Sequence, residues 1–305
     1  MCVRAGRDKR PWEPVDAVVS LLRPSEGLAM ADRTKKMERE TAHGLALAGD
    51  DTEHTWGWGT PAGQLRARRR AELIIRAAGL GPGMRVLEVG CGTGLFTEMF
   101  ARTQAHLVAL DISRALLEKA RARGLPADRV RFLEGPIENA AIDGPFDAVV
   151  GSSVLHHLDL GVALPRLHAL LAPGGKLCFA EPNLLNPQVF LERKFRRWFP
   201  YVSPDETAFV RWRLARLLAA EGFEDVSVTP FDWLHPGVPR PLISVMQWAG
   251  GRLERMPGVG EFAGSLLIRC RRPDTGVIRR SGSGPTGASD ESRCGSGDAR
   301  QPRRL

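Results

Sequence analysis

Val86-Leu87-Glu88-Val89-Gly90-Cys91-Gly92-Thr93-Gly94 is the segment on which the fold prediction depends. An apolar run ends in three glycines spaced GxGxG, and a helical pattern begins directly after them at Leu95. Glycines here allow positive φ angles and let a ligand approach the backbone, whose N–H groups point toward it. Nucleotide-binding loops of several kinds share this spacing, so the segment alone predicts a strand, a ligand-binding turn and a helix. A purely structural glycine turn is the alternative.

Short apolar runs alternate with helical patterns on both sides of this segment. The predicted strands are residues 85–89, 106–110, 130–133, 146–151, 176–180, 225–229 and 265–271. The predicted helices are residues 64–78, 95–102, 113–123, 162–171 and 203–220, the last opened by a capping box at residues 203–206. Strands that alternate with helices indicate an α/β fold with a parallel sheet and helices on both faces.

A carboxylate follows the second strand. Asp111 lies 17 residues after Gly94 and can accept two hydrogen bonds from a ribose diol, while Ile112 offers an apolar face to an adenine. NAD-binding loops read GxGxxG, whereas this loop reads GCGTG and is preceded by Glu88. The difference favours S-adenosylmethionine over NAD as the ligand. A plain helix-capping role for Asp111 is the alternative.

With these features the chain resembles the class I S-adenosylmethionine-dependent methyltransferases over roughly residues 65–230. Four motifs occur in the family's order: VLEVGCGTG at 86–94, LDIS at 110–113, FDAVV to VLHHL at 146–158 and LAPGGKL at 171–177. The resemblance implies a doubly wound, Rossmann-like, mostly parallel seven-stranded sheet with an antiparallel last strand. It also implies S-adenosylmethionine as cofactor, methyl transfer by in-line displacement, and no metal.

The resemblance further implies which residues bind the cofactor. They are Glu88, Gly90, Cys91, Gly92, Gly94, Asp111, Ile112, Ile137, Glu138 and Ser152. In the family's pattern Glu88 would orient the amino group of the cofactor and Asp111 would hold the ribose hydroxyls. The family usually reads Gly-Asp-Ala-Glu after the third strand, but this chain reads Gly-Pro-Ile-Glu at residues 135–138, so Glu138 is the substitute for the missing aspartate.

The candidate catalytic residues follow from the chemistry. A sulfonium methyl group is already activated, so the protein mainly supplies alignment and desolvation, and a base is needed only when the acceptor must lose a proton. His157 and Glu181 are predicted as catalytic because they follow the fourth and fifth strands, at the edge where ligands bind. Packing of the imidazole, and an ion pair of Glu181 with an arginine, are the alternatives.

Other segments are predicted to cover the site. Trp56, Trp58, Tyr201 and His235 are predicted to act on the substrate or as a lid. The arginines at positions 66 and 68–70 indicate a solvent-facing helix. Residues 189–199 predict a basic amphipathic helix, which serves either as a substrate lid or as a peripheral contact with an anionic membrane.

Charge and composition bound the remaining function classes. The chain of 305 residues has a formal net charge of +8, but residues 41–270 carry only +2 of it, so no specific nucleic-acid partner is predicted. No apolar run approaches the length of a membrane span, and five scattered cysteines without a CxxC pair favour a reducing, cytoplasmic location.

The sequence therefore predicts three regions and one activity. Residues 1–40 are a weakly structured extension, residues 41–272 a methyltransferase domain with cap inserts at about 182–203 and 231–263, and residues 273–305 a disordered basic tail rich in Gly, Ser and Arg. The acceptor is predicted to be a small molecule or lipid-linked. Methylation of RNA or protein, and a non-catalytic cofactor-binding or scaffold role, are the alternatives. The oligomeric state is left open.

Overall fold

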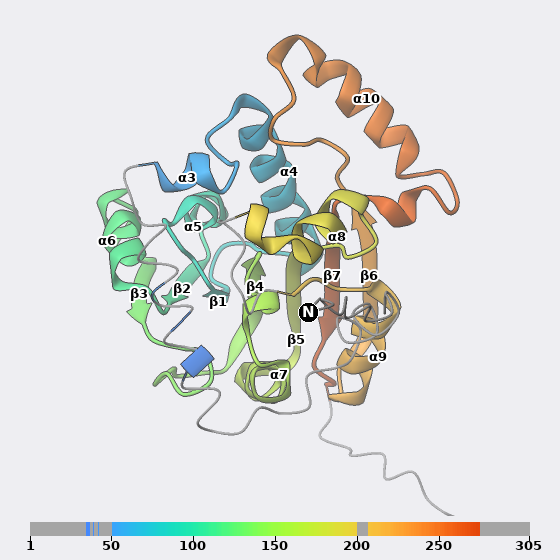
Figure 1. The fold of residues 1–305 in the computed structure, drawn as a ribbon. Helices are drawn as coiled ribbons and strands as arrows, with labels where there is room; N and C mark the ends of the chain where they lie inside the picture. The colour runs from blue at the N-terminus through green and yellow to red at the C-terminus, as the bar shows by residue number, and fades with distance from the viewer. Residues whose placement is uncertain (1–34, 37–38, 40–41, 43–50, 200–206, 275–305) are drawn as a thin grey trace, which may run out of the picture. The chain divides into compact units, whose positions relative to one another are not determined.

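Seven strands form one sheet in the computed structural model of the chain, which describes residues 35–36, 39, 42, 51–199 and 207–274 (Figure 1). The strands are β1 (Arg85–Val89), β2 (His106–Asp111), β3 (Val130–Glu134), β4 (Phe146–Ser152), β5 (Leu171–Pro182), β6 (Glu224–Phe231) and β7 (Ser265–Arg271). Their order is β3-β2-β1-β4-β5-β7-β6, and only β7 runs antiparallel to its neighbours. This confirms the predicted fold class. The order reverses between β1 and β4, and the carboxyl ends of these strands are where such sheets bind ligands.

Helices cover both faces of the sheet. The helices are α3 (Thr52–Thr55), α4 (Pro61–Ala78), α5 (Leu95–Ala101), α6 (Arg114–Ala122), α7 (Leu160–Leu170), α8 (Pro187–Lys194), α9 (Arg211–Ala220) and α10 (Ile243–Leu253). Short 3-10 turns are η1 (Leu155–His157), η2 (Arg196–Trp198), η3 (Arg240–Leu242) and η4 (Gly260–Phe262).

Alternating side chains of β1 show how the layers pack. Val86 lies in one cluster of buried side chains with Ile74 of α4 and Phe100 of α5. Leu87 points to the other face and lies in a second cluster with Leu164 of α7 and residues of α9. Successive strand residues point to opposite faces, so a strand buried on both sides reads as a continuous apolar run, as the sequence of β1 does.

Two predicted helices differ from the structure. Residues 207–210, within the predicted helix 203–220, are not helical: Phe209 bridges to Asn183, and α9 begins only at Arg211. The predicted helix 189–199 is present only in part, because α8 begins at Pro187, ends at Lys194 and is followed by the separate turn η2.

Several predictions fall outside the described residues. These are Tyr201, the capping box at 203–206, the tail from residue 275 onward and most of the extension at 1–40. The domain boundaries therefore stay predictions. Among the helices that the structure describes, none has the length and apolar character required to cross a bilayer.

Candidate functional site

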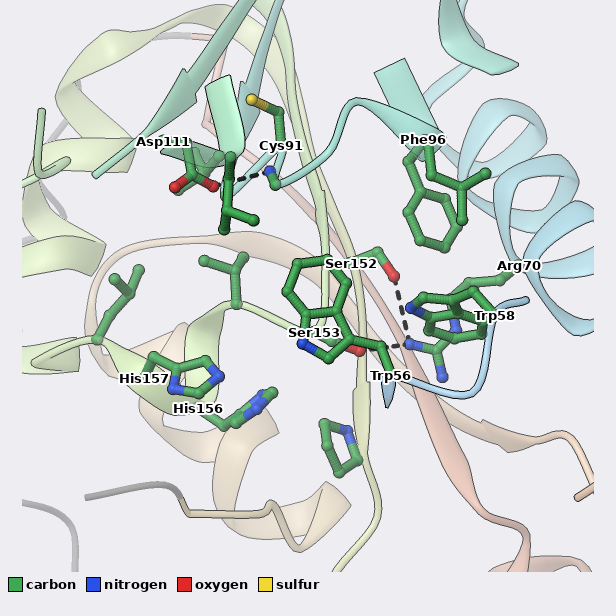
Figure 2. Close-up of a pocket in the computed structure, with 18 of the residues that line it drawn as sticks. Trp56, Trp58, Arg70, Cys91, Phe96, Asp111, Ser152, Ser153, His156 and His157 are labelled. Carbon is green, nitrogen blue, oxygen red and sulfur yellow. Dashed lines mark hydrogen bonds between the residues drawn. The ribbon is translucent and has the colours of Figure 1, made fainter. Parts of the chain in front are cut away.

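A cavity of about 1060 Å³ opens at the carboxyl ends of β1, β2 and β4 (Figure 2). Its walls are the glycine loop after β1, the segments that follow β2, β3 and β4, helix α8 and residues 232–236. Of the predicted cofactor-binding residues, Gly90, Cys91, Gly92, Asp111, Ile112, Ile137, Glu138 and Ser152 line this cavity, whereas Glu88 and Gly94 do not.

Asp111 connects the glycine loop to the end of β2. Its Oδ2 accepts a hydrogen bond of 2.8 Å from the backbone N–H of Gly92, and its Oδ1 accepts one of 2.8 Å from that of Ser113. Burial raises the pKa of Asp111, while these two N–H groups oppose the rise. Each carboxylate oxygen still has a lone pair that can accept a ligand hydroxyl at the cavity wall.

Two glycines of the loop have no room for a larger side chain. Gly90 has φ +69°, and a Cβ at that position would lie 2.4 Å from Cγ2 of Val154. Gly92 has φ +54°, and its Cβ would lie 3.3 Å from the ring of Trp56. The backbone of the loop is therefore the cavity surface, as a ligand that lies across it requires.

Glu88 lies below the loop rather than in the cavity wall. Its side chain is 1 % exposed, and Oε2 has no hydrogen-bond partner among the residues that the structure describes. Burial raises the pKa of Glu88 to about 8, with the Thr97 hydroxyl acting against the rise. At neutral pH this carboxyl is mostly protonated.

The two histidines after β4 line the cavity, but Glu181 does not. Glu181 is fully buried: Oε2 lies 2.6 Å from Nδ1 of His156, and Oε1 accepts from the N–H groups of Val154 and Leu155 at 2.9 Å each. Burial alone would raise the pKa of Glu181, but the charge of His156 and these hydrogen bonds outweigh it, so the pKa is lowered. Glu181 therefore fixes the η1 turn and the ring of His156, against which the ring of His157 packs at 4.2 Å.

Arg70 is a site residue that the sequence analysis missed. It is 3 % exposed, not solvent-facing as predicted, and it lines the cavity. Nη1 donates to Ser153 Oγ at 2.8 Å, and Nη2 donates to Ser265 Oγ at 2.5 Å (Figure 2 shows the contacts of Arg70 with Ser152 and Ser153). Arg70 follows the buried Ala67 by three residues and precedes the buried Ile74 by four, a spacing that places all three on one helix face. That spacing was the available signal.

The guanidinium of Arg70 lacks a counterion within the described chain. No carboxylate lies within ion-pair distance of it there, and its Nε has no hydrogen-bond partner among the same residues. Burial lowers the pKa of Arg70 to about 10, with the nearby Arg66 contributing, so the group stays charged at neutral pH. A buried cation at a cavity wall fits an anionic group of a ligand.

Both predicted tryptophans point into the cavity (Figure 2). Trp58 packs edge-on against Phe96 with ring centroids 5.6 Å apart, and the guanidinium groups of Arg66 and Arg70 lie 5.5 and 5.3 Å from its ring centroid. Trp58 is thus held by protein contacts. Trp56 lies against Gly92 and lines the cavity.

The cap inserts meet over the cavity. His235 Nε2 lies 2.8 Å from Nε2 of Gln188 on α8, and Asn186 Nδ2 donates to the carbonyl oxygen of Phe262 at 2.9 Å. Burial lowers the pKa of His235, and the nearby Arg66 lowers it further. The predicted lid residue His235 therefore lines the cavity and joins the two inserts, while the predicted lid residue Tyr201 lies outside the described residues.

Comparisons with known proteins agree on one kind of domain. A family model described as a methyltransferase domain matches residues 63–228. An uncharacterized methyltransferase of Mycobacterium tuberculosis is 41 % identical over 106 residues, which are 33 % of this chain and 53 % of that protein. Trans-aconitate 2-methyltransferase of Methylobacterium radiotolerans is 34 % identical over 165 residues, 53 % of this chain and 62 % of that protein. The chain thus spans about half the length of the first of these relatives.

Solved structures share the fold. The N-methyltransferase NodS of Bradyrhizobium japonicum, in complex with S-adenosyl-l-homocysteine, superposes with a TM-score of 0.53 at 21 % identity, covering 77 % of this chain and 98 % of that chain. A putative methyltransferase solved in complex with the Haloferax volcanii Trm112 methyltransferase activator superposes with a TM-score of 0.55 at 19 % identity, covering 75 % of this chain and 97 % of that chain.

Proposed function

The chain belongs to the methyltransferase domain family, in its class I S-adenosylmethionine-dependent form, and on this premise we propose that the whole protein methylates a small-molecule acceptor. The observation that carries the proposal is the single cavity that joins two chemically different ends. One end is the glycine loop with Asp111, and the other is an aromatic pocket beneath the two inserts. A methyltransferase needs a cofactor and an acceptor side by side in a space from which water is excluded.

The residues present fit the cofactor. The backbone of Gly90 and Gly92 lines the cavity without side chains of its own, and Asp111 presents a carboxylate beside it for ribose hydroxyls. Arg70 is buried and has no carboxylate partner within ion-pair distance among the described residues, so its guanidinium can bind the carboxylate of the methionine moiety. When bound, S-adenosylmethionine supplies an activated methyl group on a sulfonium sulfur, so the protein need only align and desolvate the acceptor.

The positions of the other predicted site residues in or beside the cavity suggest a role for each of them. Ile112 and Ile137 line the cavity beyond Asp111, where they form an apolar wall for an adenine. His157, which lines the cavity, is the candidate base for an acceptor that must lose a proton. Glu181 acts through His156 as a positioning residue, because its oxygens are occupied by that ring and by two backbone N–H groups.

The acceptor end favours an organic molecule with apolar surface. Trp56, Trp233 and Leu234 line it, and His235 and Gln188 supply polar atoms at its rim. This composition is typical of small-molecule pockets, which are mostly apolar with a few placed polar groups. A lipid-linked acceptor, and contact of residues 189–199 with a membrane, belong to the same proposal. A cytoplasmic location does too, supported by the free thiols of Cys91, Cys178 and Cys270.

Two measurements test the proposal. Calorimetric titration of the purified chain with S-adenosylmethionine and S-adenosylhomocysteine is expected to give saturable binding, which Asp111→Ala abolishes or greatly weakens. Incubation of the chain with cell extract and methyl-labelled S-adenosylmethionine is then expected to give a labelled small molecule on mass spectrometry. If the chain binds no cofactor, the proposed activity is wrong. If the label appears only in RNA or protein, the acceptor is a macromolecule and not a small molecule.

A further inference from the structure

Large apolar side chains are exposed in one part of the sequence. Every such side chain in the described residues falls between positions 191 and 262: Leu191, Phe195, Trp198, Trp212, Leu242, Val245, Trp248, Met256 and Phe262. All but Trp212 belong to the two cap inserts. Single exposed apolar residues are ordinary on a soluble protein, but their concentration in two adjoining inserts marks an interaction surface.

Helix α10 carries the clearest apolar stripe. Val245 and Trp248 are 59 % and 63 % exposed and lie three residues apart, and Arg252 follows four residues later with its guanidinium 3.7 Å from the ring centroid of Trp248. The buried residues Ile243 and Gly250 form the opposite face of the helix, which packs on the rest of the cap. Figure 1 shows α10 as the outermost element of the cap, away from the sheet.

A second apolar group lies on the other insert. The rings of Phe195 and Trp198 stack with centroids 5.3 Å apart, and Trp198 is 76 % exposed. The Lys194 ammonium lies 5.7 Å from the ring centroid of Phe195. This insert thus also combines exposed aromatic rings with a cation.

Each carboxylate in the described parts of the two inserts lies within ion-pair distance of an arginine. Asp232 pairs with Arg66 at 2.8 Å, Glu254 with Arg69 at 2.6 Å and Glu261 with Arg211 at 2.6 Å. The fourth, Glu192, has a side chain only 12 % exposed and lies 3.7 Å from Arg193. The exposed charged side chains that remain in these described residues are all cations: Lys194, Arg197, Arg240, Arg252 and Arg255.

We propose that the outer face of the cap, centred on Val245, Trp248 and Arg252 of α10, binds the surface of an anionic phospholipid membrane. Tryptophan and aliphatic side chains enter the headgroup boundary while arginines pair with lipid phosphates, and each cation near such a surface adds to binding. The opposite face of α10 places Gly250 against Trp233, a residue of the cavity wall. A membrane bound at α10 therefore lies next to the acceptor end of the cavity.

Charge complementarity selects the membrane over other occupants. A second copy docked through the same face would bring the exposed arginines of both chains together without carboxylates to separate them. The chain's own tail is a poor partner too, because residues 271–305 contain eight arginines against four acidic residues. An anionic lipid surface supplies the missing charge.

Sedimentation with vesicles tests the proposal, with the full chain and without cofactor, so the outcome does not depend on methyl transfer. The chain is expected to bind vesicles that contain phosphatidylglycerol, to bind pure phosphatidylcholine much less, and to be released by added salt. The double variant Val245→Ser with Trp248→Ala is expected to bind roughly tenfold more weakly. Arg252→Glu with Arg255→Glu is expected to give a loss of about tenfold or more.

Trp212→Ala is the matched control, because Trp212 is an exposed tryptophan on α9, outside the inserts. Its vesicle binding is expected to equal that of the unaltered chain, and circular dichroism checks that every variant is folded. The proposal is overturned if the α10 variants bind as well as the unaltered chain, which would assign the binding to the basic termini. It is also overturned if no vesicle is bound, or if light scattering shows a dimer that Trp248→Ala dissociates.

Discussion

Asp111 has two partners in the protein before any ligand arrives, and this decides how its variants behave. The N–H groups of Gly92 and Ser113 both donate to it, so the carboxylate holds the glycine loop and the start of α6 in place. The residue that would bind ribose hydroxyls therefore also shapes the surface on which the nucleoside lies. A change at Asp111 therefore alters both the affinity for the ligand and the order of the glycine loop.

Asp111→Ala is expected to weaken S-adenosylmethionine binding by a hundredfold or more, since two charge-assisted hydrogen bonds are worth on the order of 3–6 kcal/mol together. Asp111→Asn keeps one acceptor oxygen and is expected to lose less. Calorimetric titration measures both constants, and thermal unfolding separates lost contacts from a collapsed loop. Equal affinities of the alanine variant and the unaltered chain would contradict the assignment of Asp111.

Glu88 predicts a pH dependence of stability. In the fold its carboxyl keeps its proton up to a pKa of about 8, whereas the ordinary value is 4.5. Between these values the folded chain binds one proton more than the unfolded chain, so the stabilising effect of this group is complete at acid pH and declines as pH rises toward 8. Glu88→Gln cannot ionise and is expected to lack this decline.

The measurement is the free energy of unfolding by urea for both chains from pH 5 to about 9, where the predicted difference accumulates. Taking the difference between the two chains cancels other titrating groups, such as Asp111 with its raised pKa and His168 with its lowered one. The variant is expected to gain stability relative to the unaltered chain as pH rises. Parallel profiles would show that Glu88 ionises normally.

At the scale of elements, the strands of the sheet could be predicted, whereas the helices within the two cap inserts could not. The strands are apolar runs that end at glycines or at a carboxylate, a local signal, and the predicted and observed bounds of β1 and β7 coincide. Residues 207–210 follow a tertiary signal instead, because Phe209 exchanges backbone hydrogen bonds with Pro182 and Leu184. Strand-like pairing with a separate segment of the chain overrides the helical pattern predicted for residues 207–210.

Helix α10 was missed for a related reason. Pro239, Pro241 and the pair Gly250-Gly251 indicate a loop when read locally. In the structure the prolines precede the helix, and Gly250 allows α10 to approach Trp233, since a Cβ there would lie 3.0 Å from that of Trp233. A glycine that favours a loop in the sequence is thus a packing position in the fold.

Asn186 caps helix α8 and connects it to the other insert. Its Oδ1 accepts from the N–H groups of Gln188 and Val189, and its Nδ2 donates to Phe262 of the other insert. Asn186→Ala is expected to cost about 1 kcal/mol of helix stability through the lost cap. Amide hydrogen exchange in α8 should accelerate. Cofactor affinity should stay within about twofold, because none of the hydrogen bonds made by Asn186 reaches the glycine loop.

Asn186→Asp is the matched control, because it keeps the capping oxygen and replaces the donor to Phe262 with a carboxylate oxygen that repels the Phe262 carbonyl. It is expected to protect α8 as the unaltered chain does while loosening η4. If alanine and aspartate variants exchange at the same rate in α8, the junction between the inserts, and not the helix cap, stabilises this element.

For the molecule as a whole, Arg70 joins parts that are far apart in the sequence. From α4 it reaches Ser153 after β4, the carbonyl oxygen of Ala180 in β5 and Ser265 at the start of β7. No carboxylate within the described residues lies within ion-pair distance of it, so its desolvation is offset by neutral acceptors in direct contact and only at longer range by Asp232 and Glu181. Burial of this charge lowers the stability of the free protein, and a bound anion would offset the loss.

Arg70→Met makes this reasoning testable. The apolar side chain fits the buried site without a charge, so the melting temperature of the free chain is expected to change little or to rise. Ligand-linked stabilisation should fall sharply, because S-adenosylmethionine then loses its ion pair and with it the gain that saturating ligand gives the folded state. Thermal unfolding with and without S-adenosylmethionine measures both quantities, and Arg70→Lys should retain part of the shift. A free chain that melts far lower, with the ligand shift intact, would instead make Arg70 a structural link between α4 and the sheet.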